Sequence, residues 1–153
     1  MSQDAILPQL TAFPLATWER EGIKAALKKV GLPADDVEAP DRLFWRFETA
    51  DGVPVGFGGL ELHGDEGLLR SVVTLPPIRG RGIGAAIVAI LEVEARVLGC
   101  RALWLLTTSA AEFFADLGYA ECERVNVPPP IRATLQFAAL CPASATVMTK
   151  RLD

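Results

Sequence analysis

The sequence predicts a single mixed α/β domain, in which a mostly antiparallel sheet carries one parallel strand–helix–strand unit and is flanked by helices. Residues 42–74 contain three strand-like segments separated by turn residues. Residues 68–107 then follow the order strand, helix, strand, which is typical of a parallel crossover. The 153 residues show neither a repeat nor a serine/glycine linker, so one domain over residues 1–153 is expected.

Composition supports a globular domain and narrows its partners. Half of the residues are hydrophobic, 22% are charged and the net charge is −4. Without a basic stripe we expect no nucleic-acid partner. The N-terminus lacks a signal-peptide pattern, and no apolar run approaches the roughly 20 residues that cross a bilayer. We therefore expect a soluble, cytoplasmic protein without membrane association.

The first third of the chain is expected to hold one short strand and one helix. The strand covers residues 5–7, and the helix covers residues 15–30 with Trp18 on its apolar face. Gly31 and the proline two residues later end this helix. Residues 33–41 are acidic, contain proline and are expected to form a loop.

The antiparallel part of the sheet is expected next, with strands at residues 42–49, 53–62 and 68–74. Asp51-Gly52 has the composition of a hairpin turn between the first two. In the middle strand, Gly56, Gly58 and Gly59 indicate a bulge or a close approach of the backbone.

An apolar helix at residues 83–98, ended by Gly99, opens the second half. Its expected core face contains Ile83, Ile87, Ile90, Leu91 and Val97. The remaining elements are a strand at 102–107, a short helix at 110–117, an extended segment at 119–127, a helix at 131–140 and a last strand at 145–151. The three prolines at 128–130 must take the chain out of the sheet.

The loop from Arg79 to Gly84, Arg-Gly-Arg-Gly-Ile-Gly, joins a strand to a helix. Such a loop directs several backbone N–H groups toward one point beside the positive end of the helix, which suits a diphosphate. Arg81, like Arg79, adds a cation for phosphate. A Walker A loop is excluded because no lysine follows the glycines, and a dinucleotide-binding fingerprint fits poorly because two prolines separate the loop from its strand. A plain glycine-rich turn is the remaining alternative.

The pattern Arg79-x-x-Gly82-x-Gly84 resembles the pyrophosphate-binding signature of the GNAT superfamily of N-acetyltransferases. Residues 69–74 resemble the fourth strand of that family, which separates from the fifth strand to admit the pantetheine arm of acetyl-CoA. Residues 102–107 resemble the fifth strand, and residues 113–119 resemble the aromatic-x-x-Leu-Gly-Phe/Tyr segment after it. The resemblance covers about residues 42–125 and implies a GNAT fold with acetyl-CoA as co-substrate and no metal.

The resemblance also implies which residues contact acetyl-CoA. These are Val72, Val73, Thr74, Arg79, Gly80, Arg81, Gly82, Ile83, Gly84, Phe113 and Phe114. Backbone groups at Val72–Thr74 would position the thioester and support the developing oxyanion.

Further segments, at residues 68–72, 105–108, 131–134 and 140–145, resemble the arsenic-resistance N-acetyltransferases. Related enzymes acetylate the α-amino group of phosphinothricin or arsinothricin, so the resemblance implies a small amino-acid-like acceptor of this type. Other acceptors stay open: a polyamine, an aminoglycoside antibiotic or a protein N-terminus. A non-catalytic acetyl-CoA-binding or arsenite-binding module is the alternative from another class.

Acetyl transfer to an amine requires removal of a proton from the amine. Glu61, at the end of a strand, is the candidate base, with a solvated surface carboxylate as the alternative. Arg70 is either a clamp for an anionic acceptor or half of an internal ion pair, for example with Glu61 or Glu48. Arg46 and Arg132 are weaker clamp candidates.

Many family members use a tyrosine as the acid for the CoA thiolate, but Phe114 stands at that position and cannot donate a proton. Tyr119, the single tyrosine, is expected in the core, and the acid stays unassigned. His63 is expected on the surface, in a polar turn.

The three cysteines, Cys100, Cys122 and Cys141, are widely spaced without a CxxC pair, so neither a disulfide framework nor a metal site is predicted. Cys141 is interpreted as a small core residue, with arsenite binding as the alternative. Trp18, like Trp45 and Trp104, is expected in the core. Apolar residues near 128–140 and the edge strands favour a homodimer.

Overall fold

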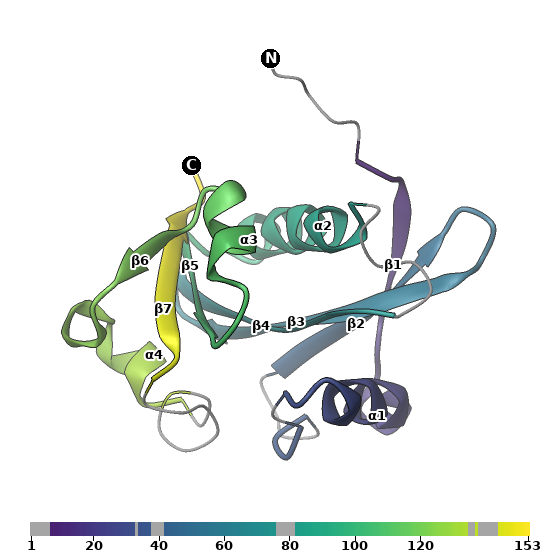
Figure 1. Cartoon of the computed structure of the whole chain (residues 1–153), viewed down its shortest axis with the longest axis horizontal. Coiled ribbons are helices and arrows are strands. Elements are labelled where there is room, and N and C mark those ends of the chain that lie inside the picture. The colour runs from purple at the N-terminus through teal and green to yellow at the C-terminus, as the bar shows by residue number, and fades with distance from the viewer. Residues whose placement is uncertain (1–6, 33, 38–41, 76–81, 135–136, 138–143) are drawn as a thin grey trace.

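The computed structural model describes residues 7–32, 34–37, 42–75, 82–134, 137 and 144–153 (Figure 1). Within these residues, seven strands form one sheet in the order β1-β2-β3-β4-β5-β7-β6. Their bounds are Leu10–Pro14 (β1), Arg42–Thr49 (β2), Pro54–His63 (β3), Glu66–Thr74 (β4), Ala102–Thr107 (β5), Ala120–Cys122 (β6) and Thr146–Arg151 (β7). β4 and β5 are parallel and the other neighbours are antiparallel, which confirms the predicted mixed α/β architecture.

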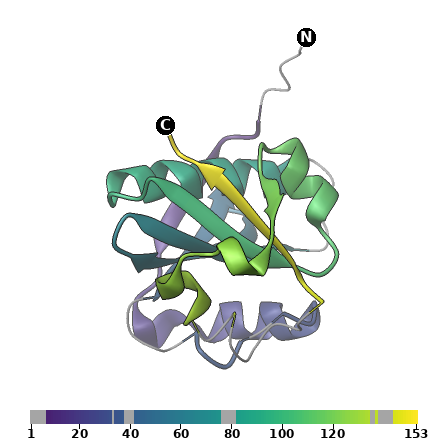
Figure 2. The same cartoon turned by 90° about the vertical axis from the view of Figure 1, so that its left-hand side faces the viewer.

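Helices cover both faces of this sheet. α2 (Ile83–Val97) and α3 (Ala111–Asp116) lie on one face, and α1 (Glu21–Lys29) and α4 (Pro129–Arg132) lie on the other (Figures 1 and 2). The layers follow from the pleat, because alternate residues of each strand point to opposite faces. Trp45 packs in the α2-side core, while its neighbour Phe44 packs with the residues of α1.

The α2 side contains the largest cluster of buried side chains. Ile87 and Leu91 are fully buried there against strand residues such as Leu60 and Leu103. Gly58 permits this packing, because an added Cβ would lie 2.6 Å from Leu91 Cδ1. The close approach of the backbone predicted for β3 is therefore confirmed, and the register shift between Phe57 and Gly59 places the extra residue in β4.

Two smaller clusters fill the opposite face. Ile23 and Leu27 of α1 pack on Phe44, and Ile131 of α4 packs beside Trp104. Trp45 and Trp104 are buried as predicted, whereas Trp18 is 86% exposed. Trp18 lies in a separate 3-10 turn (Thr17–Glu19), so the helical periodicity that placed it inside does not apply there.

The N-terminal elements differ from the predicted ones. The first strand found is Leu10–Pro14, because these residues pair with β2; residues 5 and 6 lie outside the described residues. The predicted helix at 15–30 is reduced to Glu21–Lys29. The N–H of Leu15 donates to Phe44 O, which ties this segment to the sheet and delays the helix.

The later elements agree more closely. α2 ends at Val97 with Leu98 as its C-cap, and Gly99 follows with a φ of +94°, so glycine terminates the helix as predicted. Val97 is 76% exposed, against the prediction, because the buried face follows Ile87, Leu91 and Ala95. The segment 119–127 contains only a three-residue strand followed by a 3-10 turn, and the late helix begins earlier, at Pro129, where proline suits a first turn. Among the described helices, none has the length and apolar character needed to cross a membrane.

Candidate active site

The sheet divides in its middle. In the described part of the chain, β4 and β5 pair only at Glu66–Ala102, Gly67–Leu103 and Leu68–Trp104. Beyond Leu68, β4 continues to pair with β3 as far as Thr74, and β5 continues to pair with β7 as far as Thr107. The two strands therefore separate after the Leu68–Trp104 pair, as the sequence resemblance led us to expect. This point is called the fork.

β4 carries a distortion just inside the fork. Gly59 pairs with Arg70 and Phe57 with Val73, so Ser71 and Val72 lie opposite Gly58 alone. Ser71 has a φ of 60°, a left-handed conformation that is uncommon for a residue other than glycine. Bulges of this kind redirect backbone groups out of the strand ladder. Val72, Val73 and Thr74, predicted to position a thioester, follow it directly.

The N-terminus of α2 lies beside this part of β4. Gly82 caps the helix with a φ of +76°, and Ile83 is buried in the core. A Cβ placed on Gly84 would lie 3.1 Å from Phe113 Cζ and 3.7 Å from Thr74 Cγ2. The helix backbone can therefore approach both β4 and α3, and its free N–H groups and dipole favour an anion. Arg79, Gly80 and Arg81 lie outside the described residues.

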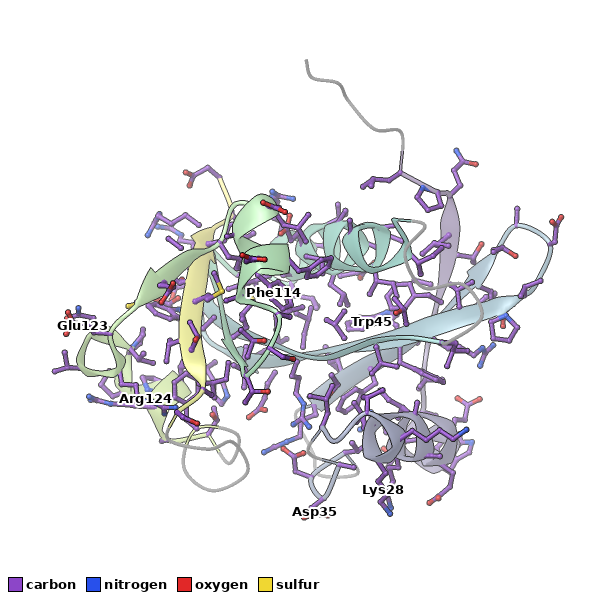
Figure 3. The ribbon with its side chains drawn as sticks, viewed as in Figure 1. Lys28, Asp35, Trp45, Phe114, Glu123 and Arg124 are labelled. Carbon is purple, nitrogen blue, oxygen red and sulfur yellow. The ribbon has the colours of Figure 1, made fainter. Side chains whose placement is uncertain are left out.

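Phe113 and Phe114 place two aromatic rings on the α2 side of the fork. Phe113 is 36% exposed and meets Phe114 edge-on at 4.9 Å between centroids. Phe114 is buried and also meets Tyr119 edge-on; Figure 3 shows it on the same side of the sheet as α2. A buried phenyl ring cannot supply a proton to a thiolate.

Tyr119 belongs to a second feature, the core cluster, which consists of Glu92, Tyr119 and Lys150. The Tyr119 hydroxyl donates to Glu92 Oε2 at 2.9 Å, and Lys150 Nζ lies 3.1 Å from both oxygens of Glu92 and 2.8 Å from Leu117 O. Burial, with the charge and hydrogen bond of Glu92, raises the pKa of Tyr119. Tyr119 is 3% exposed, so it is a core residue, as predicted.

The opposite face of the fork holds a buried group of ionisable side chains. This fork cluster consists of Asp36, Arg42, Glu61, His63 and Arg70. Arg70 Nη2 donates to Asp36 Oδ1 at 2.6 Å, Arg70 Nη1 donates to Asp36 Oδ2, and Arg70 Nε donates to Ser71 Oγ at 3.1 Å. Arg42 adds a bond from Nε to Asp36 Oδ2 at 3.3 Å.

Asp36 is the residue that sequence reasoning missed. Burial raises the pKa of its carboxyl, but the hydrogen bonds and charges of Arg70 and Arg42 outweigh this and lower the pKa below its usual value. It lies 34 residues before Arg70, in a segment predicted only as a loop, and its acidic neighbour Asp35 gives no local signal. Arg70 therefore forms an internal ion pair, which was one of the two alternatives that the sequence left open. Its main partner is Asp36 rather than Glu61 or Glu48.

Glu61 lies level with the fork, because it pairs with Leu68, the last residue of β4 that pairs with β5. It is 1% exposed, so it is not the solvated surface carboxylate that was the alternative. Its Oε1 lies 3.5 Å from Arg42 Nη2 and 3.3 Å from His63 Nε2. Its Oε2 lies 3.5 Å from Arg70 Nη1 and makes no hydrogen bond within the described residues.

His63 ends β3 rather than lying in the turn. Its side chain is 27% exposed, so it is half-buried between the solvent and Glu61. Its partner across the hairpin is Glu66, whose Oε2 accepts a hydrogen bond from Trp104 Nε1. The expectation of a surface turn gave no indication of the contact with Glu61.

The other two predicted clamp arginines have different surroundings from Arg70. Arg46 pairs with Glu48 at 2.8 Å and lies over the Phe13 ring. Arg132 is exposed on α4. No group of ligands that could hold a metal occurs among the described residues; Cys100 is buried, Cys122 lies in β6, and Cys141 is outside them.

Comparison with known proteins identifies relatives of this arrangement. A model of the acetyltransferase (GNAT) family matches residues 6–119. An amino-acid acetyltransferase of Mycobacterium tuberculosis is 42% identical over 87 residues, which are 55% of this chain and 49% of that protein. The chain thus spans about half the length of this curated relative.

Two solved structures share the fold. Rv2747 from Mycobacterium tuberculosis, crystallised with CoA, has a TM-score of 0.76 at 28% identity, covering 95% of this chain and 100% of that one. N-acetylglutamate synthase from Neisseria gonorrhoeae, crystallised with CoA and L-arginine, has a TM-score of 0.76 at 18% identity. That match covers 95% of this chain and 34% of the synthase chain.

Proposed function

The chain belongs to the acetyltransferase (GNAT) family, and from that premise we propose that it transfers the acetyl group of acetyl-CoA to the α-amino group of a small amino acid. The observation that carries the proposal is the fork, with the α2 N-terminus on one face and a buried carboxylate level with it on the other. The amino-acid acetyltransferase among the relatives favours an amino acid as acceptor.

Acetyl-CoA fits the α2 side of the fork. The diphosphate would lie at the N-terminus of α2, where Gly82 and Gly84 leave the backbone open and Arg79, Gly80 and Arg81 precede it in the chain. Phe113 and Phe114 would border the pantetheine arm. The thioester would reach β4 at Val72–Thr74, where the bulge at Ser71 frees backbone groups to stabilise the oxyanion.

Glu61 is the proposed base. An acceptor amine is protonated near neutral pH and must lose a proton before its nitrogen attacks the thioester carbon. Oε2 of Glu61, which makes no hydrogen bond within the described residues, would take that proton. No side-chain acid is assigned, because Phe114 cannot donate a proton and the Tyr119 hydroxyl is bound to Glu92. The CoA thiolate is a weak base and can take its proton from water.

The carboxylate of an amino-acid acceptor would be bound by a cationic side chain near the fork. Arg70 is 4% exposed and held by Asp36, so it would contact an acceptor only after that pair rearranges. Arg46 and Arg132 are the more exposed candidates. Phosphinothricin and arsinothricin are amino acids with an anionic side chain, so they belong to the same proposed acceptor class.

The test is a free-thiol assay with acetyl-CoA and a panel of acceptors: glutamate, glutamine, phosphinothricin, spermidine and a short peptide with a free N-terminus. We expect release of CoA with one or more of the amino acids and none with spermidine. Turnover only with spermidine or the peptide would replace the acceptor class. Calorimetric binding of CoA without turnover of any acceptor would favour a non-catalytic acetyl-CoA-binding module instead.

A further inference from the structure

The proposed reaction releases one proton per turnover, and the structure offers a route for it. Two protons leave the nitrogen when an ammonium group becomes an amide. The departing thiolate takes up one proton from water at neutral pH, since a thiol has a pKa near 8.5, and this uptake balances one of the two. The other proton must reach the solvent. This inference rests on the proposed function, with Glu61 as the first acceptor of that proton.

Glu61 cannot release a proton directly to the solvent. It is 1% exposed, so its carboxyl does not exchange directly with bulk water. Arg42 and Arg70 both face it, and a guanidinium in a protein is always protonated and cannot accept a further proton. Asp36 is held by the same two arginines, which lower its pKa, and it makes no contact with Glu61 within the described residues.

His63 differs from these neighbours in both respects. Its imidazole can accept a proton at one nitrogen while releasing another from the second nitrogen. Its Nε2 lies 3.3 Å from Glu61 Oε1, and 27% of its side chain is exposed to solvent. The other acid near it, Glu66, accepts a hydrogen bond from Trp104 Nε1. Asp65 lies in the turn that follows His63.

We propose that His63 relays the proton from Glu61 to the solvent. The acceptor ammonium loses a proton to Glu61, and the neutral carboxyl passes it to Nε2 of His63. The imidazolium then releases the proton on Nδ1 to water or buffer, and Glu61 returns to its carboxylate form. Proton exchange of the imidazole with solvent restores the Nδ1–H form of His63 for the next turnover. No oxidant, reductant or metal takes part, and each proton that leaves the nitrogen is accounted for.

The test uses the His63→Ala variant at saturating acetyl-CoA and acceptor. We expect kcat to fall about hundredfold, at the low end of the range of general acid–base effects, with the KM for acetyl-CoA unchanged. Imidazole added to the buffer should restore most of kcat, because the deleted side chain leaves a space beside Glu61 that a small base can enter. A bulky buffer of similar basicity should restore nothing, and wild-type kcat should not respond to either.

His63→Gln is the matched variant. It retains a polar side chain beside Glu61 but cannot accept a proton at one atom and release one from another. A relay predicts that Gln and Ala variants lose kcat alike, while a role in holding Glu61 in place predicts that Gln preserves it. Thermal unfolding of both variants separates either result from a loss of fold.

Each outcome has one meaning. Wild-type kcat in His63→Ala, or a loss that imidazole does not restore, would overturn the relay while leaving the acetyltransferase intact. Absence of turnover in the wild-type protein would instead defeat the proposed function from which the relay starts.

Discussion

The core cluster and the fork cluster each hold a buried glutamate beside a cation, but they differ in how their hydrogen bonds are satisfied. In the core cluster, both oxygens of Glu92 meet Lys150 Nζ and one also accepts from Tyr119. In the fork cluster, Asp36 is bound through both oxygens, whereas Glu61 has only contacts of 3.3–3.5 Å and one oxygen without a hydrogen bond among the described residues.

The difference in hydrogen bonding suggests that the core cluster serves stability and the fork cluster serves catalysis. A fully satisfied buried network rigidifies a core, and breaking it costs folding free energy. A buried acceptor without a donor is costly to the fold and is retained where it serves a reaction. A Glu→Gln substitution in the fork cluster should therefore lower activity and change stability little. The same substitution in the core cluster should lower stability and leave activity unchanged.

Glu61→Gln should give the largest effect. The amide keeps the size of the side chain but cannot act as a base, so kcat should fall about 10²- to 10⁴-fold. Stability should change little, because Glu61 lies 3.5 Å from each arginine and its Oε2 makes no hydrogen bond within the described residues. Steady-state kinetics and chemical denaturation of the same preparation measure both. A variant with full kcat would remove Glu61 from the mechanism.

Asp36→Asn should lower the free energy of unfolding by about 3 kcal/mol at pH 7, since it breaks one side of a buried ion pair. The pKa of Asp36 is lowered in the folded protein, so its contribution is present above the unfolded value of 3.8 and is lost as pH falls below it. The stability gap between variant and wild type should therefore close in acid. Urea midpoints across the pH range test this, and a gap that persisted in acid would contradict it.

Glu92→Gln should give the smallest of the three effects and the reverse of the pattern at Glu61. It removes the charge opposite Lys150 but can still accept from Tyr119, and Lys150 is 26% exposed. We expect a loss of about 2 kcal/mol in stability, near the value for a hydrogen bond to a charged group, with kcat unchanged. A kcat loss comparable to that of Glu61→Gln, at unchanged stability, would contradict the assignment of Glu92 to stability and of Glu61 to catalysis.

The fold was largely predictable because its signals are local. Strand alternation, glycine turns and the helix between two strands appear within residues 42–107, and the structure contains them all. The errors occur where tertiary contacts override local pattern. Residues 15–20 have helical periodicity, but the bond from Leu15 N to Phe44 O keeps them with the sheet, and Trp18 is left exposed.

The two halves of the site differ in the same way. The acetyl-CoA side could be proposed from a short motif, since a diphosphate loop needs neighbouring backbone groups. The fork cluster joins residues up to 34 positions apart, and neither Asp36 nor His63 could be assigned from spacing. Only the register that sets Glu61 beside Arg42 and Leu68 brings these side chains together.

The short pairing of β4 with β5 also has a mechanical consequence. Within the described residues, three register pairs form the whole ladder between β1–β4 on one side and β5–β7 on the other. Each half is internally braced by antiparallel pairing, so small rotations of one half against the other strain few hydrogen bonds. The ladder alone thus joins the two halves weakly, and the α2-side core, which contains residues of β2–β4 as well as of β5 and β7, holds them together.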